Sequence, residues 1–295
     1  MLNILVYGAT GVQASPLLKQ LQSDNHKVFA LTRSKAKVAD IPENDYQHVV
    51  EGSLTHAADL NRLTQGMDIV MLNLPFFSEN EAGSYAIDAA KRAGVKQIIW
   101  NANGEVPQIT SDRVKMNVRL ENMERLAASG IAYVVFQPTI YLENLLMQET
   151  ARRIRENNRI EMVAAPDATL PWMSAWDISA AMVKSMGKPE LNGKVMTVKG
   201  PGWDGNYLAS AFSSVLGRKI TYHQIDLLEH IKRINIALGE GHGEEIMGLA
   251  ENQDSRPSRE ATFPPFTALD ATQVLNLNLL SLESWIGQHQ DIFKQ

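Results

Sequence analysis

Residues 8–14 read Gly8-Ala9-Thr10-Gly11-Val12-Gln13-Ala14, and this stretch decides the fold. An apolar run of strand length, residues 2–7, lies before it, and residues 15–21 have the pattern of a helix. A strand, a glycine turn and a helix in this order are typical of a dinucleotide-binding site. Gly8 allows the tight turn, Gly11 lets the backbone approach a pyrophosphate, and Ala14 allows close packing of the helix on the strand.

The same turn supplies the chemistry that phosphate groups need. Free backbone N–H groups and the positive end of the following helix would both face a bound pyrophosphate. The spacing is G-x-x-G-x-x-A rather than G-x-G-x-x-G, and an ordinary strand-to-helix turn is the alternative interpretation. The dinucleotide contacts that we predict from this stretch are Gly8, Thr10, Gly11, Val12 and Gln13.

Composition and charge narrow the class of protein. The chain has 295 residues, a net charge of −5 and no cysteine. The negative charge argues against a nucleic-acid-binding surface, and the lack of cysteine excludes disulfides, thiol nucleophiles and cysteine-ligated metals. Because the sequence has neither a run of about 18 apolar residues nor a basic N-terminal leader, we expect a cytoplasmic protein that does not span a membrane.

Strands alternate with helical patterns through the first half of the chain. This alternation predicts an α/β fold with a doubly wound parallel sheet of the Rossmann type. After the first strand, apolar runs occupy residues 27–32, 47–51, 68–72, 96–100 and 132–136. Helical patterns lie near residues 57–64, 81–93 and 113–128.

The pattern changes after Pro138, where shorter strands and helices follow in mixed order. We predict that residues 1–150 form an NADP-binding domain and that segments near 174–200 return to it. Residues 151–295 would form a smaller α+β domain for a substrate or partner. Across the boundary between these two domains, the pattern predicts a helix over residues 141–156.

The end of the second strand favours NADP(H) over NAD(H). NAD-binding proteins usually have an acidic residue there to hold the ribose hydroxyls, whereas an arginine accommodates a 2′-phosphate. Here Arg33 provides a planar fork suited to phosphate, and Ser34, Lys35 and Lys37 follow it. A solvated basic turn is the alternative. We predict cofactor contacts by Arg33, Ser34 and Lys37.

The later strands are followed by residues at the carboxyl ends of the sheet, where ligands bind in this kind of fold. Ser53 and Leu54 follow the third strand, where the adenine would lie. The predicted contacts after the fourth and fifth strands are Asn73, Leu74, Pro75 and Asn101. Simple loop capping is the alternative for all of these residues.

Several segments together resemble the NmrA-like branch of the atypical short-chain dehydrogenases/reductases, over nearly the whole chain. The longest of them reads Gln137-Pro138-Thr139-Ile140-Tyr141-Leu142-Glu143-Asn144. The others are residues 8–13, 119–124 ahead of 129–131, 176–178, 217–222 and 282–286.

The resemblance implies an NAD(P)-binding protein in which the segment after the sixth strand lies beside the nicotinamide. The residues that would close the cofactor pocket are Pro138, Tyr141, Leu142, Glu143 and Asn144. A helix start, with Tyr141 and Leu142 merely packed in a core, is the alternative.

The chain departs from the conventional pattern in its acid–base residues. Conventional members of the superfamily use Tyr-x-x-x-Lys, and none of the seven tyrosines here has a lysine four residues later. Arg119 stands where the family pattern has a cofactor-contacting lysine, and it can still donate to a ribose hydroxyl. Lys115 occupies the tyrosine position and is the candidate catalytic residue. Ser53 replaces an aspartate that is common near the adenine.

Other kinds of site are not indicated by the sequence. Histidines such as His223 and His230 lack metal-ligand spacing with carboxylates. Neither a G-x-S-x-G elbow nor a P-loop occurs. We therefore expect no metal.

Two functions fit these observations. The first is an NADPH-dependent reductase of a small acceptor such as a quinone, dye or enone, which delocalises charge as it accepts hydride and so needs no strong protein acid. The second is an NADP(H)-binding redox sensor with little or no turnover and a regulatory protein partner. In both cases the sequence argues against nucleic acid as a partner. The oligomeric state stays open.

Overall fold

In the computed structural model, the described residues are 1–11, 14–22, 26–35, 47–74, 81–111, 114–247 and 258–294. The chain forms two compact units. The first contains Met1–Pro138, Ala175–Val198 and Arg256–Asn278, and the second contains Thr139–Ser174, Lys199–Ser255 and Leu279–Gln295. Each unit is therefore assembled from three separate pieces of the chain.

An eight-stranded sheet forms the centre of the first unit, and its described strand pairs are all parallel, which confirms the predicted α/β fold. In spatial order its strands are β13 (Leu269–Asp270), β10 (Lys194–Val198), β6 (Ala132–Pro138), β5 (Gln97–Asn101), β4 (Ile69–Asn73), β1 (Asn3–Val6), β2 (Lys27–Thr32) and β3 (Gln47–Glu51). The strand order reverses at β1, and in such sheets ligands bind at the carboxyl ends of the strands beside the reversal.

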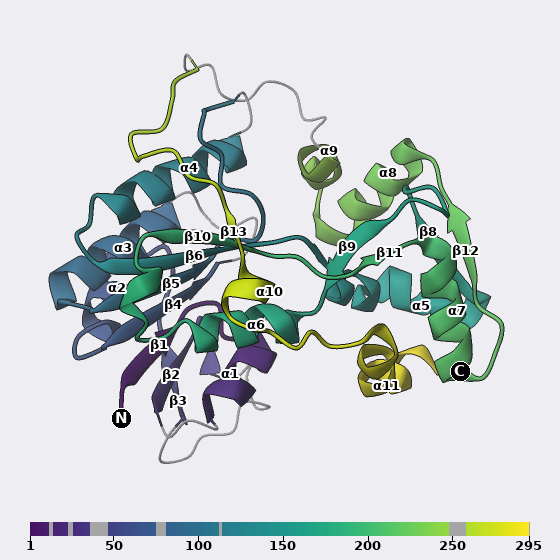
Figure 1. The fold of residues 1–295 in the computed structure, drawn as a ribbon, viewed down its shortest axis with the longest axis horizontal. Helices are drawn as coiled ribbons and strands as arrows, with labels where there is room; N and C mark the ends of the chain where they lie inside the picture. The colour runs from purple at the N-terminus through teal and green to yellow at the C-terminus, as the bar shows by residue number, and fades with distance from the viewer. Residues whose placement is uncertain are drawn as a thin grey trace. The chain divides into compact units, whose positions relative to one another are not determined.

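Helices cover both faces of this sheet (Figure 1). On one face, α1 (Ala14–Gln22) and α6 (Ala175–Lys184) pack against each other, with α10 (Ala271–Val274) near β10. The other face carries α2 (Ala57–Leu63), α3 (Glu81–Ala93) and α4 (Val114–Ala127). Because both faces are covered, the central strands are nearly continuous apolar runs.

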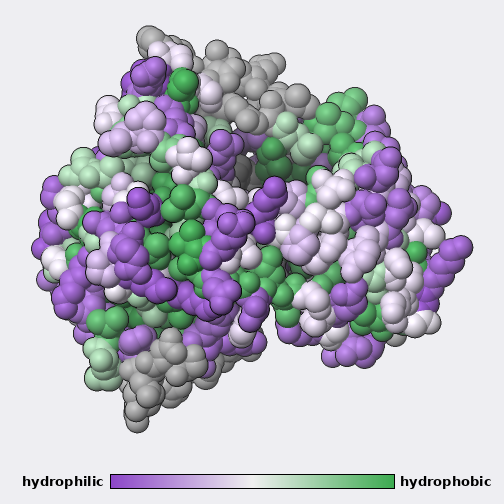
Figure 2. All heavy atoms as spheres, in the orientation of Figure 1, coloured by the Kyte–Doolittle hydropathy of each residue, from purple (hydrophilic) through white to green (hydrophobic). Residues whose placement is uncertain are grey.

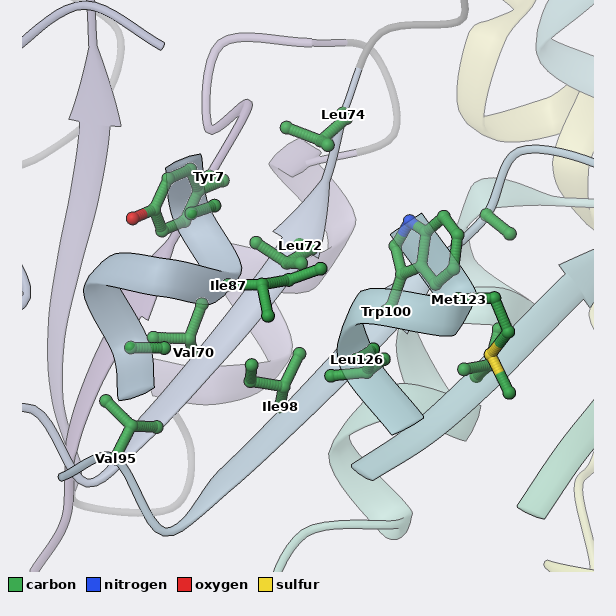
Figure 3. Packing of buried hydrophobic residues seen from close by; sticks show 14 of the residues in the cluster. Tyr7, Val70, Leu72, Leu74, Ile87, Val95, Ile98, Trp100, Met123 and Leu126 are labelled. Carbon is green, nitrogen blue, oxygen red and sulfur yellow. The ribbon is translucent and has the colours of Figure 1, made fainter. Parts of the chain in front are cut away.

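The core between the sheet and α3–α4 is built from every second residue of the central strands. Val70 and Leu72 of β4, and Ile98 and Trp100 of β5, lie close to helix side chains such as Ile87 (Figure 3). The strand residues between them are buried as well, on the opposite face of the sheet. Burying each large side chain contributes roughly 1.5–3 kcal/mol, so the centre of the sheet is the most firmly held part of this unit.

The second unit combines short strands with helices. β7 (Ile140–Tyr141), β9 (Leu170–Met173) and β11 (Gly202–Trp203) form one sheet, and β8 (Arg159–Met162) pairs with β12 (Thr221–Gln224). Its helices are a 3-10 helix (Leu142–Leu146), α5 (Gln148–Asn157), α7 (Gly205–Leu216), α8 (Leu227–Leu238), α9 (His242–Met247) and α11 (Leu282–Phe293). Trp172, Phe212, Trp285 and Phe293 are large side chains of its core.

The single helix predicted over residues 141–156 is wrong. Ile140–Tyr141 form β7, Leu142–Leu146 form a 3-10 helix, and α5 begins at Gln148. Met147 interrupts the helical path because its φ of −55° and ψ of 135° are not helical. Leu142 and Leu145 are both buried, and their spacing of three residues matches the turn of a 3-10 helix.

The described buried apolar side chains lie on both faces of the central sheet and in the core of the second unit. In the part of the chain that the structure describes, no helix has the length and apolar character needed to cross a lipid bilayer. Figure 2 shows hydrophilic residues over much of the visible surface, with smaller hydrophobic patches between them.

A largely buried carboxylate joins three elements of the second unit. Glu161 lies on β8, and its side chain is 9% exposed. It accepts hydrogen bonds from Arg153 Nη1 of α5 at 2.8 Å and from Arg233 Nη1 of α8 at 2.7 Å. Each arginine also pairs with a more exposed glutamate, Glu149 or Glu229. Glu161 is therefore the shared centre of an ion cluster.

We expect Glu161→Gln to lower the free energy of unfolding by about 3–5 kcal/mol, because it leaves two guanidinium groups without their shared carboxylate. Thermal and urea denaturation followed by circular dichroism measure the change. Glu156→Gln is the matched control, because Glu156 pairs with Arg152 and Arg155 in a solvent-exposed part of α5. Equal losses in the two variants would contradict this role of Glu161.

Candidate cofactor site

The glycine turn after β1 is held against the end of β4. Tyr7 donates its backbone N–H to the carbonyl oxygen of Met71 at 2.9 Å, and Gly11 donates to that of Gly8 at 3.0 Å. Gly8 has a φ of +68°, and a Cβ atom at this position would overlap the carbonyl oxygen of Asn73. Glycine is therefore required at position 8 for its backbone conformation and for its close approach to β4.

The turn leads into the N-terminus of α1 at the carboxyl edge of the sheet. Thr10 and Gly11 are exposed there. A helix N-terminus and an open turn backbone together fit the negative charge of a pyrophosphate. Val12 and Gln13, which the sequence also predicts as contacts, lie outside the described residues.

The loop after β2 presents Arg33 to solvent. Arg33 is exposed, and among the described residues its guanidinium has no hydrogen-bond or ion-pair partner. Neighbouring contacts hold the loop, because Thr32 Oγ1 accepts from the N–H of Ser34 at 3.2 Å and Glu51 accepts from the N–H of Lys35 at 3.1 Å. Arg33 is therefore available to an anionic ligand. Lys37 lies outside the described residues.

The loop after β3 is stabilised from within. Ser53 donates its backbone N–H to Asp59 of α2 at 3.0 Å, and its hydroxyl lies 2.9 Å from that of Thr55. The hydrogen bond from Ser53 is the main reason that the pKa of Asp59 is lowered. Leu54 packs against the core of the first unit. These are loop-capping contacts, and a contact of Ser53 or Leu54 with an adenine stays a prediction.

Three asparagines join the ends of β4 and β5. Asn73 and Asn101 end these strands and are 6% and 1% exposed. Asn101 Nδ2 donates to Asn73 Oδ1 at 3.0 Å, and Asn101 Oδ1 accepts from the N–H of Asn103 at 3.1 Å. Asn103 Nδ2 donates in turn to the carbonyl oxygen of Leu74. A chain of neutral polar groups therefore fixes the sheet edge at the ends of β4 and β5.

The sequence predicts ligand contacts by Asn73, Leu74 and Asn101, and the structure shows that Asn103, in the turn after β5, belongs to the same group. The backbone φ angles of Asn103 and Gly104 are +54° and +140°. An Asn-Gly dipeptide is a turn signal, and it could have identified this loop as a sharp turn that brings a side chain back to the sheet. Pro75 lies outside the described residues.

Arg119, on α4, reaches the same loop. Its Nη2 donates to the carbonyl oxygen of Asn103 at 3.4 Å, and its Nη1 lies 3.0 Å from the sulfur of Met116. The guanidinium covers Gly104, where a Cβ atom would lie 3.5 Å from it. Arg119 can donate hydrogen bonds at this edge but cannot shuttle a proton. The side chain of Lys115 lies outside the described part of α4.

The predicted nicotinamide segment begins at Pro138, which ends β6, and continues in the second unit. Tyr141–Leu142 is buried. Glu143 Oε1 accepts a hydrogen bond from Trp285 Nε1 of α11 at 2.9 Å, and Asn144 is exposed. The C-terminal helix therefore anchors this segment within its own unit. Contacts of these residues with a nicotinamide stay a prediction.

Tyr7, the tyrosine next to the glycine turn, is part of the core. Its side chain is fully buried, and its hydroxyl lies 3.3 Å from Thr64 Oγ1. Burial raises the pKa of Tyr7 to about 12, and the hydrogen bond to Thr64 opposes only part of this shift. No group of three or more His, Cys, Asp or Glu side chains that could hold a metal occurs in the described ranges.

We expect Gly8→Ala to weaken dinucleotide binding at least about tenfold, because the new methyl group would push the turn away from Asn73. Titration calorimetry with NADPH measures the affinity. Gly66→Ala is the matched control, because Gly66 has a φ of +74° but nothing within 4 Å of an added Cβ atom. This control should lose roughly 1–2 kcal/mol of stability without losing affinity. Wild-type affinity in Gly8→Ala would contradict the assignment of the turn.

Comparison with known proteins identifies the family of this chain. The sequence matches the model of the NmrA-like family over residues 2–281. An NAD(P)H azoreductase from Xenophilus azovorans is 30% identical over 240 residues, which are 80% of this chain and 81% of that protein.

Solved structures with the same fold include an enzyme and a regulator. A triphenylmethane reductase from Citrobacter sp., complexed with NADP(H), has a TM-score of 0.72 at 18% identity and covers 97% of this chain and 99% of its own. NmrA, a negative transcriptional regulator in complex with NADP, has a TM-score of 0.67 at 20% identity. The match covers 97% of this chain and 94% of NmrA. From the match over nearly its whole length, together with the glycine turn and the parallel sheet, this chain belongs to the NmrA-like family.

Proposed function

We propose that this protein is an NADPH-dependent reductase of small acceptors that delocalise charge, such as quinones, dyes and enones. The observation that carries the proposal is the glycine turn packed against β4, which leaves open backbone and the N-terminus of α1 at the carboxyl edge of the sheet. The relative at 30% identity, an NAD(P)H azoreductase, and the triphenylmethane reductase of similar fold support this reaction class.

Residues of the first unit would each bind one part of the cofactor. The turn and the N-terminus of α1 would hold the pyrophosphate, and Arg33 would pair with the 2′-phosphate. Arg119 would donate to a ribose hydroxyl. The asparagine chain would keep the sheet edge in one conformation, so the bound ring is held at a defined place. The bound nicotinamide supplies the hydride.

The class of acceptor follows from the acid–base residues. Arg119 stays protonated, and Tyr7 is buried with a raised pKa. An acceptor that delocalises its new charge needs no proton in the same step, so positioning can supply much of the rate, on the order of 7–11 kcal/mol in favourable cases. Water or Lys115 would deliver a proton afterwards.

A redox sensor is the second candidate function. The similar fold of NmrA, a negative transcriptional regulator in complex with NADP, supports it. The missing Tyr-x-x-x-Lys supports it too, because a sensor needs to bind the dinucleotide but not to turn it over. Its partner would be a regulatory protein, because the net charge of −5 disfavours nucleic acid.

We expect Arg33→Ala to weaken NADPH binding by roughly one to two decades and NADH binding much less. A charge-assisted hydrogen bond contributes about 1.5–3 kcal/mol, and only NADPH carries the 2′-phosphate. Titration calorimetry with both nucleotides measures the difference. Arg92→Ala is the control, because Arg92 is an exposed arginine in the last turn of α3. Equal losses of NADPH and NADH would show that Arg33 does not bind the 2′-phosphate.

Turnover tests the reductase itself. We expect NADPH absorbance at ~340 nm to fall when an azo dye, a triphenylmethane dye or a quinone is added. Lys115→Ala should keep most of this rate, because no obligatory acid is removed. Asn144→Ala, or truncation of Tyr141, should lower it up to about a hundredfold, because a small displacement of the nicotinamide is expensive. Asn206→Ala, an exposed position in α7, is the control.

Two outcomes would change the proposal. A loss of several thousandfold in Lys115→Ala, with Asn144→Ala near normal, would make Lys115 a true acid. Tight NADPH binding without turnover of any acceptor would favour the sensor.

A further inference from the structure

The strands β2 and β3 end side by side in the first unit. Thr32 and Glu51 are their last residues and are register partners in this parallel pair. Gly52 donates its N–H to the carbonyl oxygen of Thr32 at 2.9 Å, so the two chains separate only beyond this point. The register therefore fixes Glu51 at the base of the loop that carries Arg33.

The carboxylate of Glu51 reaches into this loop. Its Oε2 accepts a hydrogen bond from the N–H of Lys35 at 3.1 Å, two residues after Arg33. Glu51 is exposed, and no cationic side chain in the described part of the chain forms an ion pair with it. Arg33 has no ion-pair partner there either. Arg33 and Glu51 are thus opposite charges that do not form an ion pair with each other, and Lys35 adds a second positive charge to the loop.

We infer that Glu51 is a specificity-determining residue that limits the preference for NADPH created by Arg33; the inference rests on the proposed function. A 2′-phosphate held by Arg33 would lie near the Glu51 carboxylate, and like charges repel. The corresponding hydroxyl of NADH has no charge and can donate a hydrogen bond to a carboxylate, as it does in NAD-binding sites. Arg33 and Glu51 together therefore let one loop accept both cofactors.

The anchoring and the electrostatic roles of Glu51 can be separated by substitution. Glu51→Gln keeps an oxygen that can accept from the N–H of Lys35 but removes the charge. Glu51→Ala removes the accepting oxygen as well as the charge, so the loop after β2 loses an anchor. NADPH and NADH should therefore both bind more weakly to Glu51→Ala than to Glu51→Gln.

Titration calorimetry of the full-length protein with NADPH and with NADH tests this role. In Glu51→Gln we expect about fivefold tighter binding of NADPH and unchanged or weaker binding of NADH. The gain should shrink at high salt, because salt screens exposed charges. Glu190→Gln is the matched control, because it makes the same change of net charge in the segment before β10, at the amino edge of the sheet.

The failures of the two proposals are distinguishable. An unchanged ratio of NADPH to NADH affinity in Glu51→Gln, or an equal gain in Glu190→Gln, would overturn this inference and leave the proposed function intact. Failure of the wild-type protein to bind either nucleotide would overturn the proposed function and the inference with it.

Discussion

The close approach of Gly8 to the carbonyl of Asn73 is the constraint on which the candidate site depends. It brings the turn after β1 against the end of β4 at the place where the strand order reverses. The N-terminus of α1 then lies at the carboxyl edge of the sheet. Asn73 links this contact to Asn101 and Asn103, and Arg119 adds α4 to the same edge. Any side chain at position 8 would push the turn after β1 away from the end of β4.

Carboxamide side chains form the hydrogen bonds that join the ends of β4 and β5, and the guanidinium of Arg119 contacts the same edge from α4. Asn101 both donates and accepts there, so two strand ends and one loop share a single side chain. Carboxamides do not titrate, so the side chains that join these strand ends do not change their charge with pH. Arg33, which follows β2, and Glu51, the last residue of β3, are the charged groups that we propose distinguish a phosphate from a hydroxyl. In this proposal, neutral hydrogen bonds hold the ends of β4 and β5, and the charges that select the cofactor lie at the ends of β2 and β3.

The sequence was sufficient for features that depend on local pattern. β4 and β5 are apolar runs covered on both faces, and the glycine turn follows from spacing and context. Contacts between distant residues were not predictable. In the 3-10 helix after β7, Glu143 accepts a hydrogen bond from Trp285, which lies 142 residues further along the chain. Asn103 and Glu51 form their hydrogen bonds only when neighbouring strand ends meet, because Leu74 follows β4 and Lys35 follows β2.

The division of each unit among three pieces of chain has a consequence for synthesis on the ribosome. β6 ends at Pro138, but its neighbour β10 begins only at Lys194, after a long piece of the second unit. At roughly 5–20 residues per second, the nascent chain carries β6 for several seconds before that neighbour emerges. An unpaired strand edge is a template for pairing with other chains. Until β10 emerges, this edge of β6 can therefore pair with other chains, and aggregation competes with folding during this interval.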